Sequence, residues 1–281
     1  MKIVKTILSI LLSFILMLGL LGSTLLVIAN NYVQRGNLLQ KLEETNLYNS
    51  VYDEVRDGFE NYIYQSGLDI NIIDKICTRD KVKKDITAVV NSMYGEGEAT
   101  IDSSSIRTNL DLAINEYVES QNRKLSNEEK DNIKKFEDLI EESYKDQIGL
   151  YKKGSNEAAK KLPEVLAMLK KYQMIAVGVT AISLILLVIV NAKVVSVAGS
   201  YVGVSLVSCG VIMTFINSIV SSKIEIDSLV IFTKSLTNAV IIILKEILMS
   251  IQTYGLWYIA IGIFVIIFMN TILLLGKKYE D

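Results

Sequence analysis

Thr6–Ala29 reads TILSILLSFILMLGLLGSTLLVIA, and this stretch decides the fold. It contains no charged residue, and at about 1.5 Å per residue a helix of this length crosses a hydrocarbon layer about 30 Å thick. Lys2 and Lys5 precede it, an order that a cleaved signal peptide shares. The apolar run is longer than the roughly 7–15 residues usual in a signal peptide. We therefore expect a retained membrane anchor at residues 1–30, with cleavage after Ala29 as the alternative.

Three further apolar runs follow in the second half of the chain, and we expect them to span the membrane at about 173–190, 194–220 and 256–275. Only three residues separate the first two runs, which predicts a tight hairpin. The last run begins beside Trp257 and is followed by two lysines, residue types that favour the membrane–water interface. The single proline, Pro163, favours the first turn of a helix. We expect that helix to start near Pro163 and to continue into the next span.

The segment 223–253 is ambiguous. It is rich in Ile, Leu and Val but carries several charges, and its longest charge-free run, 235–244, is too short to span a bilayer. We interpret it as an amphipathic segment at the membrane surface or against the bundle, with a fifth span as the alternative. The side chains predicted to lie at the membrane interface are Lys170, Lys171, Lys234, Lys245, Glu246 and Trp257.

The block between the first two spans has a different character. Residues 31–172 hold 21 Lys and Arg and 26 Asp and Glu, so the block is polar and mildly acidic. Its apolar residues recur at helical spacing, which predicts several amphipathic helices, the first with the stripe Leu47, Val51, Val55, Phe59 and Ile63. Gly67 suits the end of that helix, and Thr78 and the pair Ser126 and Glu129 suit the starts of later ones.

Tyrosines flank the first apolar stripe, at Tyr48, Tyr52 and Tyr62. They are candidates for a recognition surface, although tyrosines in such a stripe more often pack in a core with their hydroxyls at its edge.

Together these patterns predict an all-α membrane protein with about four transmembrane helices and one α-helical bundle domain. The expected parts are an N-terminal anchor at 1–30, a helical extracytoplasmic domain at 31–162 and a C-terminal membrane domain at 163–281. The basic residues before the first span favour an N-terminus inside the cell, which puts 31–162 outside. The lysines within 160–171 favour the opposite orientation, but long loops cross the membrane largely regardless of charge.

Several function classes are disfavoured by composition. The chain has no histidine, which excludes Ser-His-Asp and Cys-His catalysis and every histidine-containing metal site. Cys77 and Cys209 lie in a polar and an apolar region, so we expect no disulfide between them. Glu96, Glu98 and Asp102 do not have the spacing of a calcium loop, and the charge balance lacks the basic face that nucleic acid requires. We expect no catalytic residue, cofactor, metal or nucleic-acid partner.

The third apolar run contains small residues at helical spacing, Ser196, Gly199, Gly203 and Gly210. Small residues on one face let two membrane helices approach closely, so we expect this face to pack against another helix, most simply within the same chain. Asn191, Asn217 and Asn270 lie within or near the spans and are the candidates for a polar transport path, with helix packing as the simpler interpretation.

Short motifs in the polar block resemble those of a group of uncharacterised multi-span membrane proteins from low-GC Gram-positive bacteria. The motifs are Tyr62–Leu68 (YIYQSGL), Met93–Gly95 (MYG) and Ile101–Ser103 (IDS). The resemblance implies a basic start, one anchor, a helical outer domain and a cluster of spans. It implies no activity.

We interpret the chain as a non-enzymatic protein of the cell membrane. Its outer domain is expected to recognise or scaffold another membrane or envelope protein, as part of a cell-envelope complex. The alternative is a channel or an accessory subunit of a transporter, in which Lys234, Lys245 or Glu246 would face water between spans.

Overall fold

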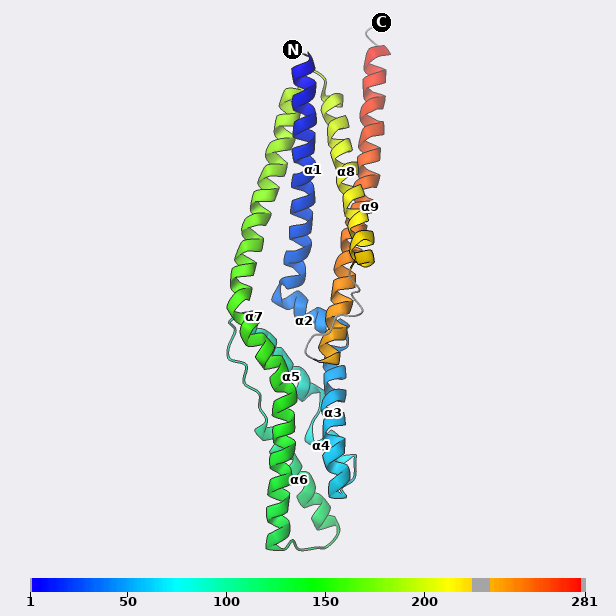
Figure 1. Cartoon of the computed structure of the whole chain (residues 1–281). Coiled ribbons are helices and arrows are strands. Elements are labelled where there is room, and N and C mark those ends of the chain that lie inside the picture. The colour runs from blue at the N-terminus through cyan, green and yellow to red at the C-terminus, as the bar shows by residue number, and fades with distance from the viewer. Residues whose placement is uncertain (1, 224–232, 279–281) are drawn as a thin grey trace. The chain divides into compact units, whose positions relative to one another are not determined.

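The computed structural model describes residues 2–223 and 233–278, and it is helical throughout (Figure 1). Helices hold 88% of the described residues, and none of these residues is in a strand. Their bounds are α1 (Lys2–Val33), α2 (Arg35–Glu44), α3 (Leu47–Ser66), α4 (Ile72–Ile76), α5 (Arg79–Met93), α6 (Ser104–Ser120), α7 (Asn127–Val190), α8 (Val195–Lys223) and α9 (Lys234–Lys278). The predicted all-α class is therefore confirmed.

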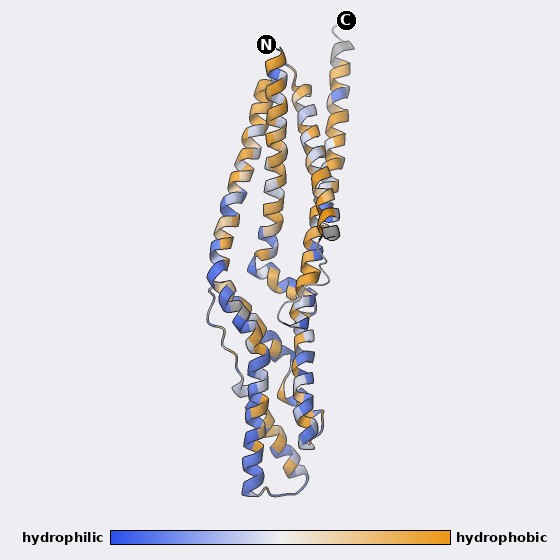
Figure 2. Ribbon diagram, in the orientation of Figure 1, coloured by the Kyte–Doolittle hydropathy of each residue, from blue (hydrophilic) through white to orange (hydrophobic). Residues whose placement is uncertain are grey.

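Four helices are long and apolar enough to cross a membrane, as the sequence predicted. The candidate spans lie within Ile3–Val33, Asn127–Val190, Val195–Val220 and Lys234–Leu275. Figure 2 shows hydrophobic residues concentrated in α1, in the later part of α7, in α8 and along most of α9.

The chain divides into two compact units. One, here called the apolar unit, comprises the described residues of 1–34, 165–229 and 243–281; the other, the polar unit, comprises those of 35–164 and 230–242. The polar unit thus includes the first turns of α9, which the sequence assigned to the membrane domain.

Two long helices differ from the sequence-based expectations. Helix α7 runs for 64 residues from Asn127 to Val190 with Pro163 in its interior, so Pro163 does not begin a helix. A proline removes one backbone hydrogen bond from a helix. Between Ser155 and Tyr172 there is no glycine and no second proline to weaken the neighbouring turns, so the helix continues through Pro163. Helix α9 joins 234–253 to the last span in one helix, so this stretch is not a separate segment. Residues 224–232 of the predicted segment lie outside the described residues.

The apolar unit is held together by small residues and by polar side chains that bond to one another. Gly203 and Gly210 of α8 lie against Gly262 and Gly255 of α9, close enough that an added Cβ would meet backbone atoms of the facing helix. Three polar pairs link α1 to the α7–α8 turn, to α8 and to α9, respectively: Ser9–Asn191 at 2.9 Å, Ser13–Ser205 at 2.8 Å and Thr24–Tyr258 at 2.7 Å. Hydrogen bonds of this kind join helices where water is absent.

The polar unit has a core built from the predicted stripes. The first stripe, from Leu47 to Ile63 on α3, is buried throughout. Phe59 lies 6.5 Å from the ring of Tyr144, which comes from α7. The predicted caps also form: Thr78 accepts from the amide of Lys81, and Gly67 ends α3 with a positive φ of 75°.

Candidate functional site

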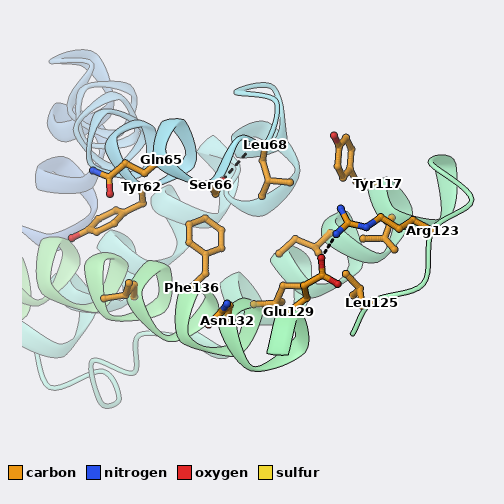
Figure 3. Close-up of a pocket in the computed structure, with 14 residues that line it drawn as sticks. Tyr62, Gln65, Ser66, Leu68, Tyr117, Arg123, Leu125, Glu129, Asn132 and Phe136 are labelled. Atoms are coloured by element: carbon orange, nitrogen blue, oxygen red, sulfur yellow. Dashed lines mark hydrogen bonds and ion pairs between the residues drawn. The ribbon is translucent and has the colours of Figure 1, made fainter. Parts of the chain in front are cut away.

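A groove opens in the polar unit where three helices end or begin. It lies between the C-terminal ends of α3 and α6 and the first turns of α7, and its volume is about 450 Å³ (Figure 3). It is lined by Tyr62, Gln65, Ser66, Leu68, Ile114, Tyr117, Val118, Arg123, Leu125, Glu129, Asn132, Ile133, Phe136 and Leu139.

Local sequence signals place these walls. Helix α3 stops because Gly67 takes the left-handed conformation that favours glycine, so the chain turns away after Gln65 and Ser66. Helix α7 starts at a reciprocal capping box: the Glu129 amide donates to Ser126 Oγ at 3.2 Å, and the Ser126 amide donates to a Glu129 carboxylate oxygen at 2.8 Å. This cap fixes the direction in which α7 leaves the loop, and so fixes the wall that α7 supplies.

The groove has an apolar floor and a polar rim. Phe136 and Tyr62 point into it from α7 and α3, and Arg123 forms an ion pair with Glu129 at the end near Leu125 (Figure 3). Two apolar lining residues are much exposed, Tyr117 at 45% and Leu139 at 47%. An apolar floor with aromatic walls and a few polar groups is typical of a site that receives apolar side chains of a partner.

A second pocket continues this surface. It is lined by residues of the turn after α3 and of α4 and α6, and it shares Leu68 and Tyr117 with the groove. Tyr117 therefore lines both the groove and the second pocket. Because a partner bound at either one would lie close to Tyr117, we choose this position to probe contact with a partner.

The ionisable groups in the core of the polar unit form a separate, closed cluster. Asp85 is 2% exposed; it accepts from Tyr144 Oη at 2.7 Å and pairs with Lys81 Nζ at 2.6 Å. Burial raises the pKa of Tyr144, and burial raises the pKa of the neighbouring Cys77 thiol to about 12. A sequestered, protonated thiol is a poor nucleophile, and the buried Asp85 carboxylate is paired with Lys81 and Tyr144.

Another acidic group in the polar unit is shifted by its surroundings. Burial raises the pKa of Glu137, and nearby Asp111 raises it further, although Arg107 lies 3.6 Å away and opposes both effects. Among the described residues, no group of three or more Cys, Asp and Glu side chains has an arrangement that could hold a metal ion.

Three of the four small residues predicted to pack against another helix lie against α9. Added Cβ atoms at Gly199, Gly203 and Gly210 would contact Met269, Ile266 and Ile259 of α9, respectively. Ser196 is 8% exposed and accepts the hydroxyl hydrogen bond of Ser200 on its backbone oxygen at 3.0 Å.

The residues predicted at the membrane interface occupy several places. Lys170 and Lys171 are exposed on α7, and Lys234 is the exposed first residue of α9. One-quarter of the way along α9, Lys245 is exposed and Glu246 is half-buried. Trp257 is 63% exposed. Their location at a lipid interface stays a prediction.

The sequence singled out a residue on only one wall of the groove. Of the three tyrosines beside the first stripe, Tyr48 and Tyr52 are buried, whereas Tyr62 lines the groove. The residues of the α6 and α7 walls showed only the helical spacing that is typical of core residues.

Comparison of the chain with family models, curated proteins and solved structures finds no match.

Proposed function

We propose that this chain is a non-enzymatic, multi-pass protein of the cell membrane that recognises another membrane or envelope protein through the groove of its polar unit. The observation that carries the proposal is the exposed aromatic and aliphatic lining of that groove. Apolar side chains exposed together around a hollow, with polar groups at the rim, are typical of protein–protein contact sites.

The apolar unit supports an anchoring role in this proposal. The buried side chains of Asn191 and Ser205 and the half-buried side chain of Tyr258 are hydrogen-bonded to side chains of α1. A transport path requires polar groups turned toward water or a solute. Mutual pairing instead closes the bundle, which favours an anchor over a channel.

We also propose that the polar unit faces the outside of the cell. Within the apolar unit, the start of α1, the turn between α7 and α8 and the end of α9 lie at the same end of the bundle (Figure 1). Lys5, Lys193 and Lys277 belong to these three segments of the sequence. An excess of lysines at one end of a set of spans favours the cytoplasmic side. Under that rule the opposite end, where α1 leads into the polar unit, is extracytoplasmic.

Photo-crosslinking in living cells tests the recognition role. A benzophenone amino acid placed at Tyr117 is expected to give a discrete higher-mass adduct, because this position borders the groove. The same amino acid at Leu112, a more exposed residue (57%) of the same helix outside the groove, is the control and is expected to give none. Equal labelling at the two positions, or no adduct at either, contradicts the proposal.

A matched pair of substitutions shows whether the adduct depends on the groove. Leu139 and Leu150 are both on α7, and they are 47% and 45% exposed, but only Leu139 lines the groove. Leu139→Lys is expected to abolish the adduct formed at Tyr117, because it places a charge in the apolar contact surface. Leu150→Lys is expected to leave the adduct unchanged.

A further inference from the structure

The first turn of α9 is held on the polar unit by a set of hydrogen bonds that the proposed recognition role does not use. Glu54 of α3 accepts the backbone amide of Ser235 at 2.9 Å with one carboxylate oxygen. Its other oxygen accepts the hydroxyl of Tyr151, from α7, at 3.3 Å, and that hydroxyl lies 2.8 Å from Thr233 Oγ1. Thr233 Oγ1 in turn accepts the amide of Leu236 at 3.2 Å. We call Glu54, Tyr151 and Thr233 the clamp.

The clamp satisfies a requirement that every helix start has. The first backbone amides of a helix have no partner within the helix, and its N-terminal end carries partial positive charge. At α9 the hydroxyl of Thr233 and a carboxylate supplied from α3 fill this role. Ser235 is 5% and Tyr151 8% exposed, so the hydrogen bonds are shielded from competing water.

The clamp and the groove are built on the same two helices. Helix α3 carries Glu54 and, about 12 Å further along, Tyr62 on the groove wall. Helix α7 carries Phe136 in the groove and Tyr151 in the clamp. A change in the separation of α3 and α7 at the groove therefore changes the separation of Glu54 and Tyr151.

We propose that occupancy of the groove is transmitted by α3 and α7 to the clamp, which releases the first turn of α9. Helix α9 is one helix from Lys234 to Lys278, which begins in the polar unit, continues into the apolar unit and includes the last candidate span. The inference rests on the proposed recognition role of the groove. Bulk inserted between α3 and α7 loosens the clamp, because α3 holds Glu54, α7 holds Tyr151, and the hydrogen bond between these two side chains tolerates only a few tenths of an ångström of added separation.

Hydrogen exchange of the full-length protein in detergent micelles tests the clamp, with mass spectrometry of peptides covering 233–240 as the readout. Glu54→Ala is expected to speed exchange there about tenfold, the effect of losing a hydrogen bond to a charged acceptor. Asp53→Ala removes the exposed acid one residue earlier on the same helix and is expected to have no effect. Unchanged exchange in Glu54→Ala overturns the proposal.

A covalent probe tests the coupling without a partner. Pyrene maleimide on Tyr117→Cys fills the groove, and on Leu112→Cys it marks the same helix outside the groove; native Cys77 and Cys209 are buried and stay unlabelled. The Tyr117 label is expected to speed exchange at 233–240 about threefold, and the Leu112 label to have no effect. The Tyr117 effect is expected to vanish in the Glu54→Ala background.

These outcomes separate the two proposals. A label at Tyr117 that leaves exchange at 233–240 unchanged, while Glu54→Ala speeds it, overturns the coupling and leaves the recognition role standing. Absence of a crosslinked adduct at Tyr117 in cells overturns the recognition role, whatever the exchange experiment shows.

Discussion

Replacing glycines of the apolar unit by alanine tests the close packing of α8 against α9. A Cβ at Gly203 would lie 2.6 Å from Ile266 Cγ1 and 2.9 Å from the backbone oxygen of Gly262, well inside the 3.4 Å at which ordinary contact begins. The backbone of α9 cannot rotate away as a side chain can. Gly178 of α7 is the matched control, because no described atom outside its own helix lies within 4 Å of its Cβ position.

The size of the effect follows from this comparison. Alanine gains about 1 kcal/mol over glycine in a helix, and this gain is common to both substitutions. Overpacking a close-packed contact costs about 1–3 kcal/mol. Gly203→Ala is therefore expected to be about 1–3 kcal/mol less stable than Gly178→Ala. Gly199→Ala is expected to fall between them, because the three atoms nearest its Cβ position all belong to the flexible side chain of Met269.

Thermal denaturation of the purified full-length protein in detergent, followed by circular dichroism, measures the difference. At about 2–4 °C per kcal/mol for a protein of this size class, Gly203→Ala is expected to melt roughly 2–12 °C below Gly178→Ala. Equal melting temperatures for Gly203→Ala and Gly178→Ala would refute the close approach of the two helices.

Two further predictions concern the polar unit and use unfolding of the same preparation. Tyr144→Phe removes the hydroxyl that donates to buried Asp85 and is expected to cost about 1.5–3 kcal/mol, whereas Tyr64→Phe, 83% exposed, is expected to cost nothing; equal costs contradict the assignment. Glu137 has a raised pKa in the folded state, so the folded state binds its proton more tightly than the unfolded state and this residue disfavours folding at neutral pH. Glu137→Gln is therefore expected to melt higher than wild type near neutral pH, and this advantage should shrink as pH falls through the pKa of folded Glu137; an advantage that grows toward acid contradicts the shift.

Much of the fold was predictable because it depends on local signals. The capping box at Ser126 and the glycine at Gly67 act within four residues of themselves, and both form as the sequence predicts. The stripe from Leu47 to Ile63 lies on one face of a helix and is buried. Four candidate spans follow from length and apolar composition alone.

The remaining features depend on contacts between distant segments. Pro163 lies inside α7. A proline makes a helix less stable, but the hydrogen-bonded turns on either side of it can offset that free-energy cost. The start of α9 belongs to the polar unit because Glu54, 181 residues earlier, accepts the amide of Ser235. The groove likewise combines residues from three helices, and only Tyr62 carried a signal that set it apart from core residues.

Thiol accessibility on intact cells tests most directly the central claim that the polar unit is displayed outside the cell. Both native cysteines are buried, at 1% and 0% exposed, so the wild-type protein supplies the unlabelled control. A cysteine at Ser104, an exposed position at the start of α6, is expected to react with a membrane-impermeant maleimide without permeabilisation. Reaction only after permeabilisation would place the polar unit in the cytoplasm and contradict recognition of an envelope partner.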